Sequence, residues 1–232
     1  MRILILAGRG RTEDPWHDHA ATSHRLATIL ADLPAAEVEV RSLFAGPYPE
    51  LQLDLDSRDL LVLNIGGAQP GYLSAGLGSA DAGFDSLTAS IAAWARGGGA
   101  VLAVHQTLTA VEQEPWLLDV VGGTWIDGVS GHPPIGPMRL KLAVDHPAVG
   151  GVGHVDAYDE RYCHLFPQPD VEVIGWTTDD DGVRHPVCWI NTSHGGRTFY
   201  SPLGHDVRSF DSPSHQQLLR AAATWLVTLS AA

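Results

Sequence analysis

The chain has 232 residues, 44% of them hydrophobic and 18% charged, which is enough to bury one sizeable core. Its 27 acidic residues outnumber 14 basic ones, giving a formal net charge of −13. Nucleic acid or an anionic membrane would need a basic face, so we expect neither as a partner. The two cysteines, Cys163 and Cys188, form no Cys-x-x-Cys pair and indicate a reducing compartment. We therefore expect a cytoplasmic protein, and no apolar stretch is long enough to span a bilayer.

The first half of the chain alternates strands and helices. Apolar runs typical of buried parallel strands occupy residues 2–8, 59–67 and 100–104, and a half-exposed alternating strand occupies 36–43. Helices are expected over residues 20–33 and 84–96, with a glycine-rich loop over 68–83. This order predicts an α/β fold with a doubly wound, mostly parallel sheet.

The second half is richer in strands. A helix is expected from His105 to Leu118, with Pro115 interrupting it. Strands are expected over residues 138–144, 171–176, 185–190 and 197–203, followed by an amphipathic helix over 214–229. The chain contains no internal repeat, long linker or low-complexity segment, so we expect one domain over residues 1–232.

The stretch "GGGAVLAVHQTL" (97–108) ends a buried strand at His105. Carboxyl ends of strands are where open α/β sheets bind ligands, and a sharp strand-to-helix turn there lifts one side chain above the sheet. An imidazole at that turn can act as a general acid or base or as a metal ligand. The alternative is a histidine that only caps the next helix.

Two other loops follow predicted strands. In "WHDHAATSH", His17 and Asp18 can point into the same crevice, although a solvated surface loop is the alternative. In "NIGG", Asn64, Gly66 and Gly67 can offer a side-chain amide and backbone N–H groups to a ligand oxygen. Glycines that only permit a tight turn are the alternative.

The second half adds more candidates. His132 in "GHPP" lies in an irregular loop, whereas the other His-Pro pairs favour structural turns. In "YDERY", Glu160 lies among aromatic residues that can raise the pKa of a carboxyl, or else it belongs to a first helical turn. In "LGHD", His205 and Asp206 follow a strand as a catalytic pair, or Asp206 caps a helix.

These stretches, in their order and spacing, resemble the ThuA-like (trehalose utilisation) family over nearly the whole chain, from "HD" at 17–18 to "LGHD" at 203–206. The resemblance implies a flavodoxin-like fold of the class I glutamine amidotransferase type. In that superfamily the turn carries a catalytic cysteine, whereas here it carries His105, so we expect no glutaminase activity. Two departures are "SHGG" at 193–196 and the extra histidines of the first loop.

The resemblance implies an enzyme of carbohydrate catabolism that acts on trehalose, a related glucoside or its 3-keto form. We expect catalytic roles for His105, Glu160, His205 and Asp206. Substrate contacts are expected from His17, Asp18, Asn64, Gly66, Gly67, Gln106, Trp116, His132 and Tyr162. Two versions of the site stay open: zinc bound by His17, His105 and His205, or a metal-free acid/base site. The alternative function is a non-catalytic sugar-sensing or partner-binding domain, and homo-oligomerisation is the default for either.

Overall fold

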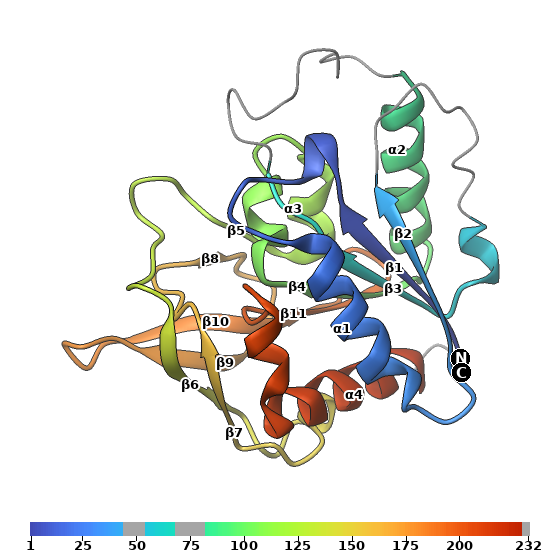
Figure 1. Cartoon of the computed structure of the whole chain (residues 1–232). Helices are drawn as coiled ribbons and strands as arrows, with labels where there is room; N and C mark the ends of the chain where they lie inside the picture. The colour runs from blue at the N-terminus through green and yellow to red at the C-terminus, as the bar shows by residue number, and fades with distance from the viewer. Residues whose placement is uncertain (44–53, 68–81, 229–232) are drawn as a thin grey trace.

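In the computed structural model, residues 1–43, 54–67 and 82–228 are described, and their main sheet has the strand order β2-β1-β3-β4-β11-β10-β9-β6-β7 (Figure 1). Five adjacent strands run parallel: β2 (Glu37–Leu43), β1 (Arg2–Gly8), β3 (Leu60–Asn64), β4 (Ala100–Val104) and β11 (Arg197–Ser201). The other four pair antiparallel: β10 (Arg184–Asn191), β9 (Glu172–Thr178), β6 (Gly136–Leu142) and β7 (His154–Asp159).

The sheet is therefore mixed, which refines the expectation of a mostly parallel one. Helices separate strands in the first half of the chain, and a crossover of that length allows parallel pairing. The strands from β6 to β10 are joined without an intervening α-helix, so they pair antiparallel. A separate two-stranded ribbon joins β5 (Gly123–Thr124) to β8 (Phe166–Pro167).

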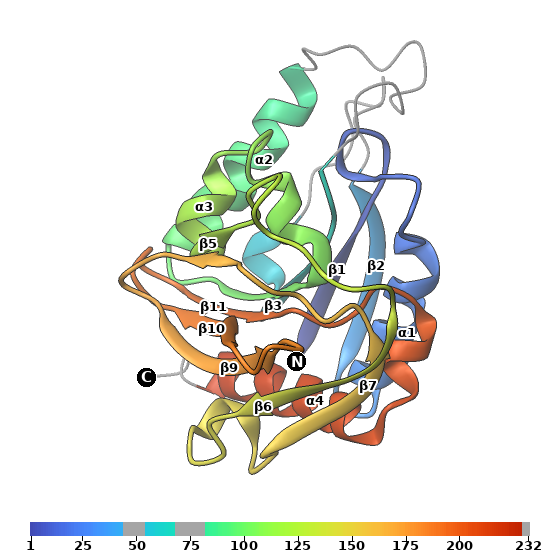
Figure 2. The same cartoon turned by 90° about the vertical axis from the view of Figure 1, so that its left-hand side faces the viewer.

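Helices cover both faces of the parallel half. Helix α1 (His19–Ala31) packs beside α4 (Pro213–Thr228) on one face, whereas α2 (Ala82–Arg96) and α3 (Trp116–Val121) lie together on the other (Figures 1 and 2). None of the helices in the described part of the chain combines the length and apolar character of a membrane span.

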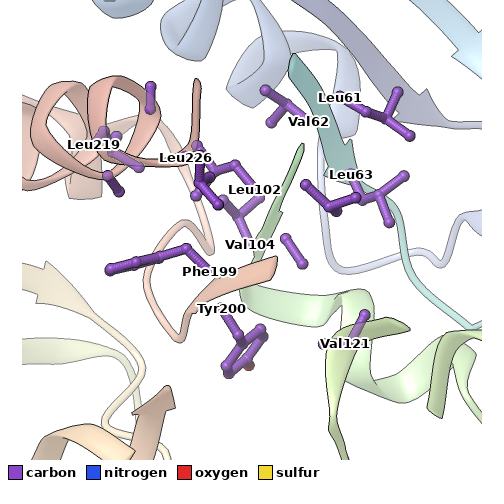
Figure 3. Close-up of a cluster of buried hydrophobic side chains, with 14 of the residues drawn as sticks. Leu61, Val62, Leu63, Leu102, Val104, Val121, Phe199, Tyr200, Leu219 and Leu226 are labelled. Carbon is purple, nitrogen blue, oxygen red and sulfur yellow. The ribbon is translucent and has the colours of Figure 1, made fainter. Parts of the chain in front are cut away.

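The core lies where these layers meet. Figure 3 shows Leu102 of β4 near Leu226 of α4, whereas Tyr200 of β11 points to the opposite side, on the side of Val121. Strands β3 and β4 are buried at every position, as expected for strands covered on both faces. This rigid centre fixes the strand ends from which the polar residues described below project.

Most predicted elements are confirmed to within a few residues, with two corrections. The single helix expected from His105 to Leu118 is a 3-10 turn, η3 (His105–Ala110), followed by α3, and Pro115 lies at the start of α3 rather than interrupting a helix. Proline suits a helix start because it has no N–H to satisfy there. Strand β7 was not predicted. The loop expected at 68–83 falls largely outside the described residues.

The parallel strands bring their carboxyl ends to one edge of the sheet. The segments after β1, β4 and β11 leave the sheet there, and β7 also ends at this edge because it runs in the same direction as β11. Residues far apart in sequence are therefore brought together.

A buried histidine makes the fold sensitive to acid. The imidazole of His215 in α4 has no exposed surface, and it stacks on Phe210 with ring centroids 5.1 Å apart. Burial lowers the pKa of His215 below its ordinary value of 6.5, and the hydrogen bond with the Ser209 carbonyl offsets this only in part. As the pH falls, His215 is therefore protonated at a higher pH in the unfolded chain than in the folded protein. The stability due to a neutral His215 is present above pH 6.5 and is lost as the pH falls below it.

We predict that His215→Phe reduces the loss of unfolding free energy between pH 6.5 and pH 5, by at most about 1.4 kcal/mol per pH unit. Urea unfolding at several pH values measures this slope, so a uniform change of stability in the variant does not interfere. His154→Ala, at a side chain that is 54% exposed, is the control and should keep the wild-type slope. Equal slopes for wild type and His215→Phe would contradict the prediction.

Candidate active site

Four side chains from distant segments meet at the carboxyl edge of the sheet. His17 comes from the loop after β1, His105 from the end of β4, Glu160 from the end of β7, and His205 from the turn after β11. One nitrogen or oxygen atom from each lies within 4.8 Å of the others. We call these four residues the His–Glu cluster. It gathers three histidines and the glutamate predicted from the sequence.

His105 occupies a strained turn. Its φ is +44°, a left-handed conformation that non-glycine residues seldom adopt. The Tyr200 hydroxyl donates to the His105 carbonyl at 2.8 Å, and His105 Nδ1 donates to the Pro202 carbonyl at 2.8 Å. The second bond leaves the other ring nitrogen, Nε2, without its proton and aimed into the cluster. The strand therefore ends in an imidazole whose direction and tautomer are both fixed.

His17 is oriented by a carboxylate that the sequence analysis missed. Its Nδ1 lies 2.9 Å from Asp14 Oδ1 and 3.0 Å from Asp14 Oδ2. Asp14 is buried and also accepts the backbone N–H groups of Trp16 and His17 and the side-chain amide of Gln106. A carboxylate acceptor keeps the proton of His17 on Nδ1 and leaves a lone pair on Nε2.

The two fixed tautomers create a conflict inside the cluster. His17 Nε2 lies 3.1 Å from His105 Nε2 and 3.0 Å from His205 Nδ1. With both Nδ1 protons donated outward, the Nε2 lone pairs of His17 and His105 face each other, and two lone pairs repel at that distance. A cation between them, either a proton or a metal ion, removes the repulsion; donation from His205 Nδ1 to His17 Nε2 or from the Tyr162 hydroxyl to His105 Nε2 also lowers it.

Glu160 supplies the negative charge beside these rings. Its carboxylate lies 3.2 Å from His205 Nδ1 and 3.5 Å from His105 Nε2. Burial alone raises the pKa of Glu160, but hydrogen bonds and charges from the two histidines outweigh it and bring the pKa well below its usual range. Glu160 is therefore ionised and cannot act as a neutral acid in this arrangement.

Asp159 supports the cluster from behind. Its side chain accepts the backbone N–H groups of Glu160 and Gly204 at 2.8 Å and of His205 at 3.3 Å. It is buried and ties the end of β7 to the turn after β11. The acid next to Glu160 thus positions two members of the cluster, whose segments lie far apart in sequence.

His105 binds a proton more readily than His17 does, because their pKa values are shifted in opposite directions. Burial lowers the pKa of both His105 and His17. At His105 the hydrogen bond with Glu160 and the charges of Asp159 and Glu160 outweigh burial, so the pKa is raised. At His17 the hydrogen bond with Asp14 opposes burial, but the charges of His105 and His205 add to it, and the pKa stays lowered. When one proton occupies this pair, it resides on His105.

Tyr162 and His132 form an aromatic wall beside the cluster. The Tyr162 hydroxyl lies 3.1 Å from His105 Nε2, and the two rings stack with centroids 4.7 Å apart. Burial raises the pKa of Tyr162 well above its ordinary value, so it remains a neutral phenol. His132 Nε2 lies 3.5 Å from Glu160 Oε1, and its side chain is 32% exposed. Tyr162 and His132, both predicted as substrate contacts, therefore border the cluster.

Other predicted site residues have partners elsewhere. Asp18 caps α1 by accepting the Ala21 N–H, and the Asn64 amide donates into α1, to Thr22 and Ser23 among others. Asp206 caps the 3-10 helix η5 (Val207–Asp211) and forms an ion pair with Arg208. These polar groups hold the fold around the cluster and lie outside it.

The glycines and two further side chains also serve packing. The N–H of Gly66 donates to the Thr12 carbonyl and that of Gly67 to Thr109 Oγ1, so both donors are already used. A Cβ at Gly66 would collide with the carboxamide of Gln106, so glycine lets that amide reach Asp14. Trp116 donates its indole N–H to Glu114 and packs against the core.

A second group of potential ligands, His164, Asp179 and His185, is satisfied internally. His185 Nδ1 accepts the His164 backbone N–H at 3.4 Å, and His185 Nε2 lies 2.8 Å from Asp179. Both ring nitrogens of His185 therefore have protein partners. The thiols of Cys163 and Cys188 belong to neither group, and burial raises the pKa of each.

Comparison with known proteins places the chain in a family. The model of the ThuA family, described as trehalose utilisation, matches residues 71–226, more than half of the sequence. The chain belongs to the ThuA family. This confirms the resemblance seen in the motifs. No curated protein matches it.

Solved structures share the fold of this ThuA protein at low identity. A ThuA-like protein of Parabacteroides merdae is 18% identical with a TM-score of 0.75, and the match covers 98% of this chain and 89% of that one. A cytoplasmic protein of Salmonella typhimurium is 14% identical with a TM-score of 0.62, covering 97% and 99%. A β-galactosidase of Bacillus circulans is 12% identical with a TM-score of 0.60, covering 98% of this chain but 30% of that enzyme. The same fold thus also occurs as part of a longer chain.

We predict that Asp14→Asn lowers the pKa of His17 further in metal-free protein, because the hydrogen bond and negative charge of Asp14 are what raise it. Titration of the imidazole 15N and 1H signals by NMR measures the shift. The pKa of His215, which lies in the helical layer, should not change. An unchanged pKa for His17 would show that Asp14 does not control its protonation.

Proposed function

We propose that this ThuA protein is an enzyme of carbohydrate catabolism that holds a divalent metal ion, with zinc favoured, in the His–Glu cluster and acts on a glucoside or its 3-keto form. The observation that carries the metal is the close approach of His17 Nε2 and His105 Nε2, 3.1 Å apart, while the Nδ1 atom of each ring is bonded outward. The substrate class is supported by the family description, trehalose utilisation.

The cluster residues fit a zinc ion. Three imidazole nitrogens and one carboxylate match the ligands that zinc prefers. Zinc–nitrogen bonds of about 2.0–2.1 Å in a tetrahedral arrangement place two nitrogens about 3.3 Å apart, close to the 3.0 and 3.1 Å found here. The outward hydrogen bonds of His17 and His105, to a carboxylate and a backbone carbonyl, are those that orient metal-binding histidines. His17, His105, His205 and Glu160 would hold the ion.

When bound, a divalent ion supplies a Lewis acid that polarises a carbonyl or activates water. The chain's own residues supply proton transfer and orientation. The Tyr162 phenol is a neutral donor in contact with His105, and His132 is exposed enough to reach a bound ligand. Burial of most of the cluster excludes bulk water, which strengthens these interactions.

Two further expectations enter the same proposal. The order β2-β1-β3-β4-β11 corresponds to the 2-1-3-4-5 order of flavodoxin-like sheets and supports the relation to class I glutamine amidotransferases. Since the strand-end turn carries His105 and both thiols lie elsewhere with raised pKa values, we propose no glutaminase activity. A cytoplasmic location is in keeping with the two free cysteines.

We predict that protein purified without a histidine tag contains close to one equivalent of metal, measured by inductively coupled plasma mass spectrometry after dialysis against added zinc. His105→Ala and His17→Ala should lose it, while His154→Ala at an exposed position should keep it. Circular dichroism checks that each variant is folded. Full metal content in folded His105→Ala would contradict the ligand assignment. Absence of metal from the wild type would leave the metal-free acid/base site.

We predict turnover within a panel of trehalose, 3-ketotrehalose and related glucosides, each assayed with zinc-loaded protein. Tyr162→Phe should lower kcat by about 10²-fold or more, because it removes a proton donor in contact with the cluster. Cys163→Ala with Cys188→Ala should stay within a few-fold of wild type, since no thiol takes part. Binding of a sugar without turnover would instead support the non-catalytic sugar-sensing domain, and neither binding nor turnover would refute the carbohydrate proposal.

A further inference from the structure

A short loop beside the His–Glu cluster is unusually well fixed. We call residues 125–132 the site loop; it follows β5 and leads toward β6. The Ser130 side chain accepts the Ile126 N–H at 3.0 Å and donates to the His164 carbonyl at 2.7 Å. Gly131 pairs with Cys163 through two backbone hydrogen bonds, Gly131 N–H to Cys163 O at 3.1 Å and the reverse at 2.8 Å. The loop is therefore anchored to the segment that follows Glu160 and Tyr162.

This anchoring places Trp125 beside Tyr162, whose ring separates it from His105 of the cluster. The Tyr162 ring stacks on the His105 ring, with centroids 4.7 Å apart. The centroid of the Trp125 ring lies 5.1 Å from that of Tyr162 and 6.1 Å from that of His132. The indole N–H donates to Asp127 in the same loop at 3.1 Å. The rings of Trp125 and Tyr162 meet at 62°, and with its polar atom satisfied the partly exposed indole presents apolar ring surface.

The same loop exposes two large aliphatic side chains. Ile126 and Val129 are exposed by 39% and 52%. Trp116 and Trp125 both pack on the edge of the core, but Trp116 donates its indole N–H to Glu114, whereas the Trp125 ring contacts Tyr162. Of Trp16, Trp116 and Trp125, Trp125 is the one with a ring contact to Tyr162 or His132.

We propose that Trp125 binds the second ring of a two-ring glycoside, while the first ring reacts at the His–Glu cluster. The inference rests on the proposed function and extends it to a substrate class. A pyranose has an apolar face of C–H groups, which packs on an aromatic ring, and hydroxyl groups at its edge that need hydrogen-bond partners. His132 and Asp127 stand on the same loop to supply them. A rigid platform loses little entropy on binding, which suits recognition of a part that does not react.

The test compares two-ring and one-ring probes on the same zinc-loaded protein. Isothermal titration calorimetry measures the affinities for trehalose and for methyl α-D-glucopyranoside, each also as its 3-keto form. Trp125→Leu should weaken binding of the two-ring probe by roughly tenfold and leave the one-ring probe within about twofold. Trp125→Phe keeps an aromatic face and should retain most of the two-ring affinity. Trp225→Phe, on α4, is the matched control.

The possible failures are distinguishable. Equal affinities of wild type and Trp125→Leu for the two-ring probe, or equal losses for both probes, would overturn the role of Trp125 while leaving the proposed function intact. Binding of neither probe by the wild-type protein would refute the proposed function and this inference with it. Metal content and thermal unfolding, measured on each variant, show that the cluster and the fold are retained, and Trp125→Phe serves where Trp125→Leu does not fold.

Discussion

The opposed ring nitrogens of His17 and His105 are the constraint on which the rest of the site depends. Each ring is held by an outward hydrogen bond, to the Asp14 carboxylate and to the Pro202 carbonyl, and each bond fixes which nitrogen keeps its proton. Rotating either ring to relieve the repulsion would break a bond to a buried acceptor, and an unpaired buried acceptor is costly. The protein therefore maintains an arrangement that a positive charge between the two rings stabilises.

The sheet makes this arrangement possible. His105 stands at the end of a fully buried strand, so the backbone beneath it cannot relax, and the left-handed turn is held by the Tyr200 hydroxyl. Asp159 performs the matching task on the other side by binding the N–H groups of Glu160, Gly204 and His205. Site geometry thus derives from packing and backbone hydrogen bonds rather than from contacts within the cluster alone.

Sequence reasoning found the residues that project from predicted strand ends and missed those that support them. His105 and His205 were identified because an apolar run stops at each, and parallel strands end at a common edge. Asp14 carries no such signal, and its only cue is its position three residues before His17. Asn64 and Gln106 lie where site residues were expected, yet both donate to buried groups. Direction of a side chain depends on packing, which spacing alone does not reveal.

The same limit applies to the fold. The parallel strands β1, β3 and β4 follow from apolar runs, whereas β7, with the sequence "HVDAYD", buries few of its positions and gives a weak strand signal. Its pairing with β6 depends on long-range register, including Arg139 opposite Asp156. Glu160 was predicted as a site residue, but the strand that brings it to the cluster became evident only with the topology.

The cluster also joins the two halves of the sheet. His17 and His105 belong to the parallel half, whereas Glu160 follows the outermost antiparallel strand, at the opposite end of the strand order from β2. An ion bound by all of them would act as a cross-link closing loops of chain far longer than any local turn. Loosening of the antiparallel half would then require release of the ion, so occupancy of one small site would govern the cooperativity of unfolding across the whole sheet.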